Sequence, residues 1–198
     1  MALTRKGEAT RQRIVEGAAE VIRERGVLAT TLDDVRARTR TSKSQLFHYF
    51  PDGKEELLLA VARWEADRVI EVQQPVLGTL RTWDDFRTWR QVVLGHYTEQ
   101  GRHCPLNVVM SQIGRNTPGA QSVVTQLMQR WLSELTAGIE HLRAAGEVRP
   151  GLDPRQAASA LLAGVQGGVL MLLTTGEAEH LEAALEVGIA GLRAGKQG

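Results

Sequence analysis

The chain has 198 residues, 42% hydrophobic and 24% charged, which is ordinary for a globular protein with one or two small domains. A single cysteine, Cys104, excludes an internal disulfide framework and a multi-cysteine zinc site. Uninterrupted apolar segments fall short of the roughly 20 residues that span a bilayer, so no membrane association is expected. The start of the chain, Met1 to Arg13, is basic and lacks the apolar core of a secretory signal, which favours a cytoplasmic location.

Basic residues are concentrated at the start of the chain. Residues 1–54 contain 11 lysines and arginines against 7 aspartates and glutamates, whereas the formal net charge of the whole chain is only +1. Proteins that bind nucleic acid need cations near the phosphates, and a global average can hide such a local excess.

Helical signals dominate the whole chain, and strand-like alternation is nearly absent. The apolar spacing, together with threonine, glycine and proline signals, predicts four helices in the first half, at about residues 7–25, 32–39, 43–49 and 54–73. The fourth is expected to end before Pro75 and Gly78. Five more helices are predicted at about 83–100, 106–113, 120–145, 154–175 and 178–193. The fold class is therefore all-α, with about nine helices.

The segment from Thr41 to Phe50 is the most informative part of the sequence. It begins with small hydroxyl residues, ends in an aromatic cluster, and follows the second predicted helix through a tight turn, as in a helix-turn-helix. Because so short a helix is not stable alone, Leu46, Phe47 and Phe50 are expected to pack it against Val35 and the first helix.

The opposite side of this helix carries polar groups suited to DNA. Glutamine and serine can hydrogen-bond to base edges in the major groove, and lysine, histidine, tyrosine and hydroxyl groups can contact phosphates. The candidate DNA-binding residues are Thr31, Arg40, Thr41, Ser42, Lys43, Ser44, Gln45, His48, Tyr49 and Lys54.

Residues of about 10 to 58 resemble the DNA-binding domain of TetR-type transcriptional regulators. The resemblance rests on an amphipathic first helix, a glycine, a threonine before the second helix, and an aromatic-rich third helix before a lysine. Those features are Ile14, Ala18, Gly26, Thr31, Val35, Ser42, Phe47, His48, Tyr49, Phe50 and Lys54. The resemblance implies a helix-turn-helix domain at 1–54 and a helical ligand-binding and dimerisation domain at 55–198. It also implies a homodimeric repressor, released from a palindromic operator by a small apolar or aromatic effector.

The turn between the second and third helices departs from the family pattern, which usually has small residues and a glycine there. Arg36, Thr39 and Arg40 occupy those places. Arg40 is strained if a left-handed conformation is required, because a Cβ is disfavoured there. The turn is expected to persist in altered detail, with Arg36 and Arg40 adding contacts to phosphates.

Two further sets of candidates follow from the resemblance. Lining residues for a small-molecule pocket between the middle helices are Trp64, Trp83, Phe86, Trp89, Tyr97, Cys104, Met110, Met128 and Trp131, although aromatic residues at helical spacing are more often simply core. The last two helices place small residues between large ones, which suits a four-helix dimer interface. Its candidates are Leu161, Gly164, Val165, Gly168, Val169, Leu172, Leu185 and Ile189, with packing inside one chain as the alternative.

Other functions are left open by particular residues. Cys104 lies beside Arg102 and His103, which can lower a thiol pKa, so a repressor switched by electrophiles or oxidation is one alternative. A helical protein that sequesters a ligand and keeps a vestigial DNA-binding helix is another. No catalytic motif, metal-ligand spacing or cofactor-binding loop is present in the sequence, so no enzymatic activity, metal or cofactor is expected.

Overall fold

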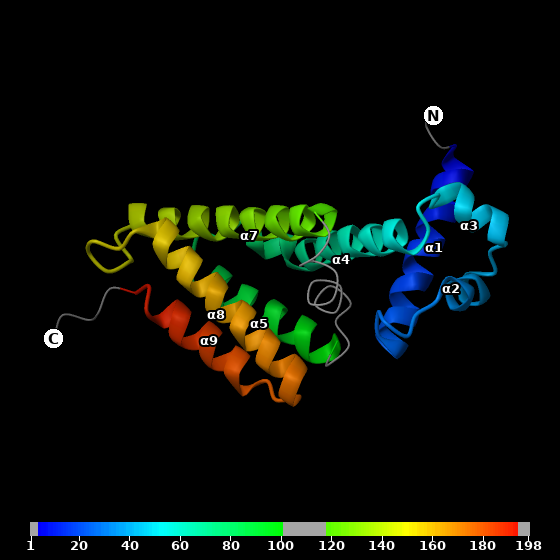
Figure 1. Cartoon of the computed structure of the whole chain (residues 1–198). Coiled ribbons are helices and arrows are strands. Elements are labelled where there is room, and N and C mark those ends of the chain that lie inside the picture. Colours follow the sequence, from blue (N-terminus) through cyan, green and yellow to red (C-terminus); the bar gives the residue numbers. More distant parts are fainter. Residues whose placement is uncertain (1–3, 101–117, 194–198) are drawn as a thin grey trace. The chain divides into compact units, whose positions relative to one another are not determined.

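The structure is a computed structural model that describes residues 4–100 and 118–193 (Figure 1). Within those ranges the chain is all-α, as predicted, with eight helices and no strand. The helices are α1 (Arg5–Arg25), α2 (Leu32–Thr39), α3 (Lys43–Tyr49), α4 (Lys54–Leu77), α5 (Trp83–Gln100), α7 (Pro118–Ala144), α8 (Pro154–Thr175) and α9 (Glu179–Ala190). The helix predicted at 106–113 lies outside the described residues.

The chain divides into two compact units. Among the described residues, the first comprises 4–68 and 118–125, and the second comprises 69–100 and 126–193. Helices α4 and α7 each run from one unit into the other without a break.

The core of the first unit is built on the apolar face of α1. Ile14, Ala18 and Ile22 are almost fully buried and recur at four-residue spacing, as the sequence predicted. Capping residues set the starts of the first three helices: Thr4, Thr31 and Ser42 each accept a hydrogen bond from a backbone N–H in the first turn of the helix that follows.

Helix α1 approaches α2 closely because position 17 has no side chain. A Cβ at Gly17 would lie 2.3 Å from the Cγ2 methyl of Thr39, well inside van der Waals contact. Thr39 is buried, and its hydroxyl donates to the carbonyl of Val35 at 2.8 Å. The small residue that the contact between these helices needs is therefore on α1 instead of α2.

Helix α4 is longer than predicted, because Pro75 does not end it. The helix continues to Leu77, with Pro75 inside it. A proline lacks one N–H donor and its ring crowds the carbonyl of the preceding turn, but the next turn closes again, since the N–H of Gly78 donates to the carbonyl of Gln74 at 3.3 Å. Burial of Leu77, which is 1% exposed, holds this last turn in place.

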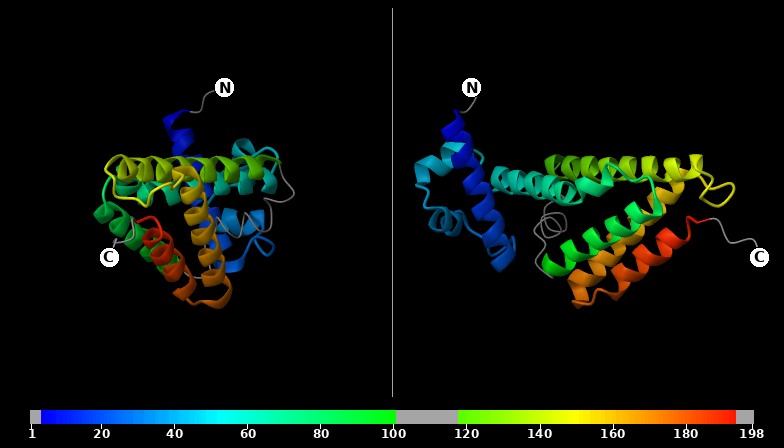
Figure 2. Two further views of the ribbon diagram at one scale, coloured as in Figure 1. Left: turned by 90° about the vertical axis from the view of Figure 1, so that its left-hand side faces the viewer. Right: turned by 180° about the vertical axis from the view of Figure 1, so that it is seen from behind.

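In the second unit, α8 and α9 pack against each other, and α5 lies against α9 (Figures 1 and 2). The close approach of α8 and α9 depends on Gly168, where a Cβ would lie 2.5 Å from the backbone Cα of Leu181. The core also contains one buried polar pair, in which the indole N–H of Trp89 donates to Oε1 of Gln73 at 2.8 Å.

Helix α8 has 22 residues, and an 18-residue segment of it has a mean hydropathy of 1.7, so by length and composition alone it could cross a membrane. Gln166 and several glycines interrupt its apolar residues, so no unbroken apolar segment of that length stands in the sequence. Leu161, Val165, Val169 and Leu172 of this helix are buried within the unit. Packing inside the unit therefore accounts for part of its apolar composition, whereas Leu170 and Met171 of the same helix remain exposed.

A buried carboxylate on α4 faces α1. Glu65 is 1% exposed, its Oε1 lies 3.9 Å from Nη1 of Arg23, and that oxygen accepts no hydrogen bond among the described residues. Burial raises the pKa of the Glu65 carboxyl, and the charges of Arg23 and Arg68 oppose the rise only in part.

We expect Glu65→Gln to stabilise the protein at pH 8 by on the order of 1 kcal/mol. With a raised pKa, the folded state binds a proton more tightly than the unfolded chain. Stability from Glu65 therefore falls as pH rises from its ordinary pKa through the raised one. Urea denaturation from pH 4 to pH 8 should show that the substitution flattens this dependence.

The matched control for that experiment is Glu71→Gln, because Glu71 is an exposed glutamate of the same helix. It is expected to leave the pH dependence unchanged. A Glu65→Gln protein less stable than the parent at pH 8 would mean that attraction to Arg23 outweighs the cost of burial.

Candidate nucleic-acid interface

Helix α3 is held to the first unit by one apolar side. Leu46 and the following Phe50 are fully buried, one turn apart on the same face. The guanidinium of Arg11 lies 5.1 Å from the ring centroid of Phe50, which ties α1 to the end of α3. This packing stabilises a seven-residue helix that would not form alone.

Phe47 does not share in this packing as fully as predicted. Its side chain is 39% exposed, and its ring rests near Gly53, where a Cβ would lie 3.6 Å from Cε1. The reason is helical geometry, because residue 47 is turned by about 100° from residue 46 around the helix axis.

The polar side of α3 gathers most of the predicted DNA-binding residues on one short segment. Ser42, Lys43, Ser44, Gln45 and His48 are exposed, and Tyr49 is half-buried. They present a cation, hydroxyl groups, an amide and two rings that can donate to or accept from base edges and phosphates. The rings of His48 and Tyr49 meet edge to face with centroids 4.9 Å apart.

Helix α3 starts with a capping box between Ser42 and Gln45, which fixes the first turn of the helix. The backbone N–H of Gln45 donates to Oγ of Ser42 at 3.1 Å, and the N–H of Ser42 donates to Oε1 of Gln45 at 3.2 Å. Two backbone donors are satisfied reciprocally, so the side chain of Gln45 leaves the helix in a defined direction.

The turn before α3 takes the strained conformation that the sequence suggested. Arg40 has φ 50° and ψ 44°, in the left-handed region, and is the one residue other than glycine with positive φ among those described. The N–H groups of Arg40 and Thr41 both donate to the carbonyl of Arg36, which closes the end of α2 in a Schellman-type turn. Arg40 itself is exposed beside α3.

We expect Arg40→Gly to raise the free energy of unfolding by about 0.5–1 kcal/mol, because glycine adopts this conformation without the Cβ penalty. Arg40→Ala keeps the Cβ and loses the same charge, so it should give no gain. Chemical denaturation of the two variants separates them, and equal stabilities would contradict strain at this residue.

Three predicted DNA-binding residues lie in other settings. Thr41 is 5% exposed, and its hydroxyl forms a hydrogen bond with the hydroxyl of Thr39 at 2.8 Å, so it belongs to the turn's interior. Lys54 donates from Nζ to the carbonyl of Val27 at 3.1 Å, which anchors the connection between α1 and α2. Thr31 shares a capping box with Asp34, its hydroxyl donating to that carboxylate at 2.6 Å.

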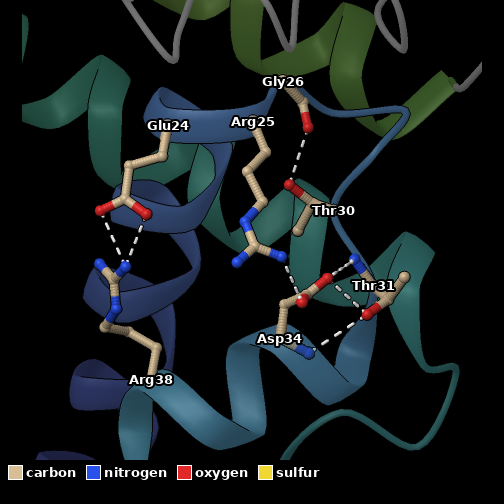
Figure 3. Close-up of polar contacts among 7 residues, drawn as sticks. All are labelled: Glu24, Arg25, Gly26, Thr30, Thr31, Asp34 and Arg38. Carbon is tan, nitrogen blue, oxygen red and sulfur yellow. Dashed lines mark hydrogen bonds and ion pairs between the residues drawn. The ribbon is translucent and has the colours of Figure 1, made fainter.

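Ion pairs that the sequence analysis did not identify join α1 to α2 (Figure 3). Nη2 of Arg38 donates to both carboxylate oxygens of Glu24, at 2.8 and 2.6 Å, and Nη1 of Arg25 lies 2.6 Å from Oδ1 of Asp34. The bond from Arg38 lowers the pKa of Glu24, and the bond from the Thr31 hydroxyl lowers the pKa of Asp34. No sequence signal pairs residues 14 positions apart on different helices.

The predicted pocket residues mostly belong to the core. Phe86, Trp89, Tyr97 and Trp131 are buried, whereas Trp64, Trp83 and Met128 are half-buried. The indole N–H of Trp131 is buried without a hydrogen-bond partner in the part of the chain that the structure describes. Cys104 and Met110 lie outside the described residues.

The predicted dimer residues are largely used within one chain. Seven of the eight are buried, and Gly164 is half-buried. A Cβ at Gly188 would lie 2.6 Å from Cδ1 of Leu161, so these residues bring α8 and α9 together. The same two helices expose three other large apolar residues, Leu170, Met171 and Val187, at 58%, 41% and 71%.

Two family models match the chain. Residues 14–61 match the model described as "Bacterial regulatory proteins, tetR family". Residues 79–187 match the model described as "Tetracyclin repressor-like, C-terminal domain".

Among curated relatives, the chain is 31% identical over 105 residues to an uncharacterised HTH-type transcriptional regulator of Mycobacterium tuberculosis, covering 52% of this chain and 53% of that protein. It therefore spans about half the length of that relative. It is 41% identical over 63 residues to the HTH-type transcriptional repressor AcnR of Corynebacterium glutamicum, covering 32% and 33% of the two chains.

Solved structures with the same fold cover nearly the whole chain. A TetR transcriptional regulator from Chloroflexus aurantiacus has a TM-score of 0.80 at 25% identity, covering 97% of this chain and 100% of that one. The SmeT–triclosan complex, SmeT being the repressor of a Stenotrophomonas maltophilia multidrug efflux pump, has a TM-score of 0.69 at 24% identity, covering 95% and 93%.

Proposed function

The chain belongs to the TetR family of DNA-binding transcriptional regulators, which are not enzymes, and on this premise we propose that it is a ligand-released repressor of a palindromic operator. Residues 1–54 are the DNA-binding domain, and residues 55–198 bind the effector and form the dimer. A regulator of this kind works in the cytoplasm, where the chromosome is.

One observation carries the proposal for DNA reading. Helix α3 buries Leu46 and Phe50 and exposes Lys43, Ser44 and Gln45, so its polar side is free to enter a major groove. Gln45 supplies base-edge contacts, and Lys43 contacts a phosphate. Ser42, Ser44, His48, Tyr49 and Arg40 extend the same surface.

Repression is supported by the similarity to AcnR, a named repressor. A repressor that occupies its operator blocks transcription by excluding polymerase, and it needs no further chemistry of its own. The release step therefore has to act on the geometry of the DNA-binding domains.

A homodimer would present two α3 helices to half-sites about one DNA turn apart. Family regulators act as dimers, and α8 and α9 expose Leu170, Met171 and Val187. Buried residues of these helices, such as Val165 and Leu185, pack α8 against α9 and so hold the exposed apolar residues in place.

The effector is a small apolar or aromatic compound held among the aromatic residues of the second domain. SmeT, which has the same fold, was solved with triclosan, an aromatic compound. Because α4 runs from one unit into the other, a tilt of α4 is a direct path from effector to α3.

Selection of bound sequences from random duplex DNA tests the proposal. We expect an enriched inverted repeat whose half-site centres are about 10 base pairs, or a multiple of that, apart. Compounds that release the protein from this duplex then identify the effector class. If no sequence is enriched at physiological salt, the protein is instead a helical ligand-binding protein without a working DNA-binding helix.

A further inference from the structure

A groove between α5 and α9 has an unusual concentration of arginines. Its volume is about 310 Å³, at the lower end of the range for small-molecule sites. Arg87 and Arg90 of α5 line it, together with Arg193, which follows α9. All of these residues belong to the second unit, and Trp83 is the one lining residue of the groove that was also among the predicted pocket residues.

Among the residues that the structure describes, cations outnumber carboxylates around this groove. Arg87 is paired with Asp84 at 2.6 Å on its own helix. Glu186 is the acidic residue among those lining the groove, and its Oε2 lies 3.6 Å from Nη2 of Arg90. Arg193 adds a third guanidinium, so among the described residues three cations stand against the carboxylates of Asp84 and Glu186, which favours a bound anion.

Arg90 also has unused hydrogen-bonding capacity. Its Nε is buried and has no hydrogen-bond partner among the described residues, and 3.6 Å to Glu186 is too long for a good hydrogen bond. Glu186 is 73% exposed, so water weakens its hold on Arg90. Because Nε is buried even with the groove empty, a ligand oxygen would approach Arg90 through the exposed part of its side chain, which is 29% exposed.

The groove also has an apolar wall, and Arg193 is held in position beside it. The guanidinium of Arg193 lies 4.7 Å from the ring centroid of Trp83, and the backbone of Arg193 forms a bridge with Val148. Trp83 and Ile189 provide an apolar wall beside the guanidinium groups. A ligand that fits has one anionic group and a compact apolar body.

We propose that this groove binds an aromatic monocarboxylate. The forked donors of arginine match the two oxygens of a carboxylate, and the wall of Trp83 and Ile189 accepts the ring. The site is independent of DNA binding, so its test does not depend on the proposed regulatory function.

Calorimetric titration of the full-length protein with 1-naphthoate tests the proposal, with neutral 1-naphthamide as the matched ligand. Naphthoate should bind at least about tenfold more tightly than naphthamide, the worth of one charge-assisted hydrogen bond. Arg90→Met should weaken naphthoate binding by about tenfold or more and leave naphthamide binding unchanged. Glu186→Gln, which removes the competing carboxylate from an exposed side chain, should tighten naphthoate binding several-fold.

Arg130→Met is the control, because Arg130 is an exposed arginine of α7 that does not line the groove. It should change naphthoate affinity by less than about twofold. The proposal is overturned if naphthoate gives no binding heat, if naphthamide binds equally well, or if Arg130→Met weakens binding as much as Arg90→Met. Binding that Arg90→Met and Glu186→Gln both leave unchanged places the ligand elsewhere and also overturns it.

Discussion

Replacing Gln45 with glutamate is expected to weaken operator binding by about 100-fold while α3 stays folded. A glutamate at this position still accepts the backbone N–H of Ser42, so the capping box is kept. It can no longer donate to a base, and its charge is repelled by the phosphates on both sides of the groove. Fluorescence anisotropy with a selected duplex at fixed salt measures the loss, and thermal denaturation checks the fold.

Lys43→Ala supplies the contrasting variant on the same helix. If Lys43 contacts a phosphate, its loss should weaken binding to all duplexes alike and lower the slope of log affinity against log salt by about one per subunit. Arg130→Ala removes one charge from α7 and serves as the control. If Gln45→Glu left the operator affinity unchanged, the assignment of α3 to the DNA interface would be wrong.

The second large effect is expected at the contact between α1 and α2. Gly17→Ala should lower the free energy of unfolding by about 1–3 kcal/mol, even though alanine favours a helix over glycine by about 1 kcal/mol. The new methyl would lie 2.3 Å from Cγ2 of Thr39, a stiff β-branched side chain in a buried place. Urea denaturation measures the change. Operator affinity should fall as well, because α2 positions the turn into α3.

Thr39→Ser is the matched partner for a double-mutant cycle. Serine removes the clashing methyl and keeps the hydroxyl that donates to the carbonyl of Val35. The double variant should recover most of the lost stability, with a coupling energy of at least about 1 kcal/mol. Additive effects would contradict a direct clash between these two residues.

The sequence predicted the elements well where their ends carry local signals. Helix α8 begins at Pro154 and stops before Gly176, as expected, because proline suits a first turn and glycine accepts the left-handed cap. Thr31 and Ser42 cap α2 and α3 for equally local reasons. Such signals are contained in a few neighbouring residues, so a single sequence reveals them.

Contacts between helices were harder to predict. Periodicity showed that α8 and α9 have apolar faces, but it does not say which surface covers them, and residues such as Val165 proved to be buried within the chain. Thr41 and Lys54 were likewise predicted to contact DNA, but in the structure they form hydrogen bonds with Thr39 and with the carbonyl of Val27. Gly17 compensates for a large residue 22 positions away, which only the packed structure reveals.

The most direct test of the DNA-binding helix is the affinity of the intact protein for its selected duplex against a scrambled duplex of equal length, at one salt concentration near 0.15 M. Sequence-specific reading by α3 predicts binding to the selected duplex about 1,000-fold tighter or more, because base contacts add to the phosphate contacts that both duplexes share. Equal affinity for the two duplexes would contradict it, since charge alone would then account for all binding.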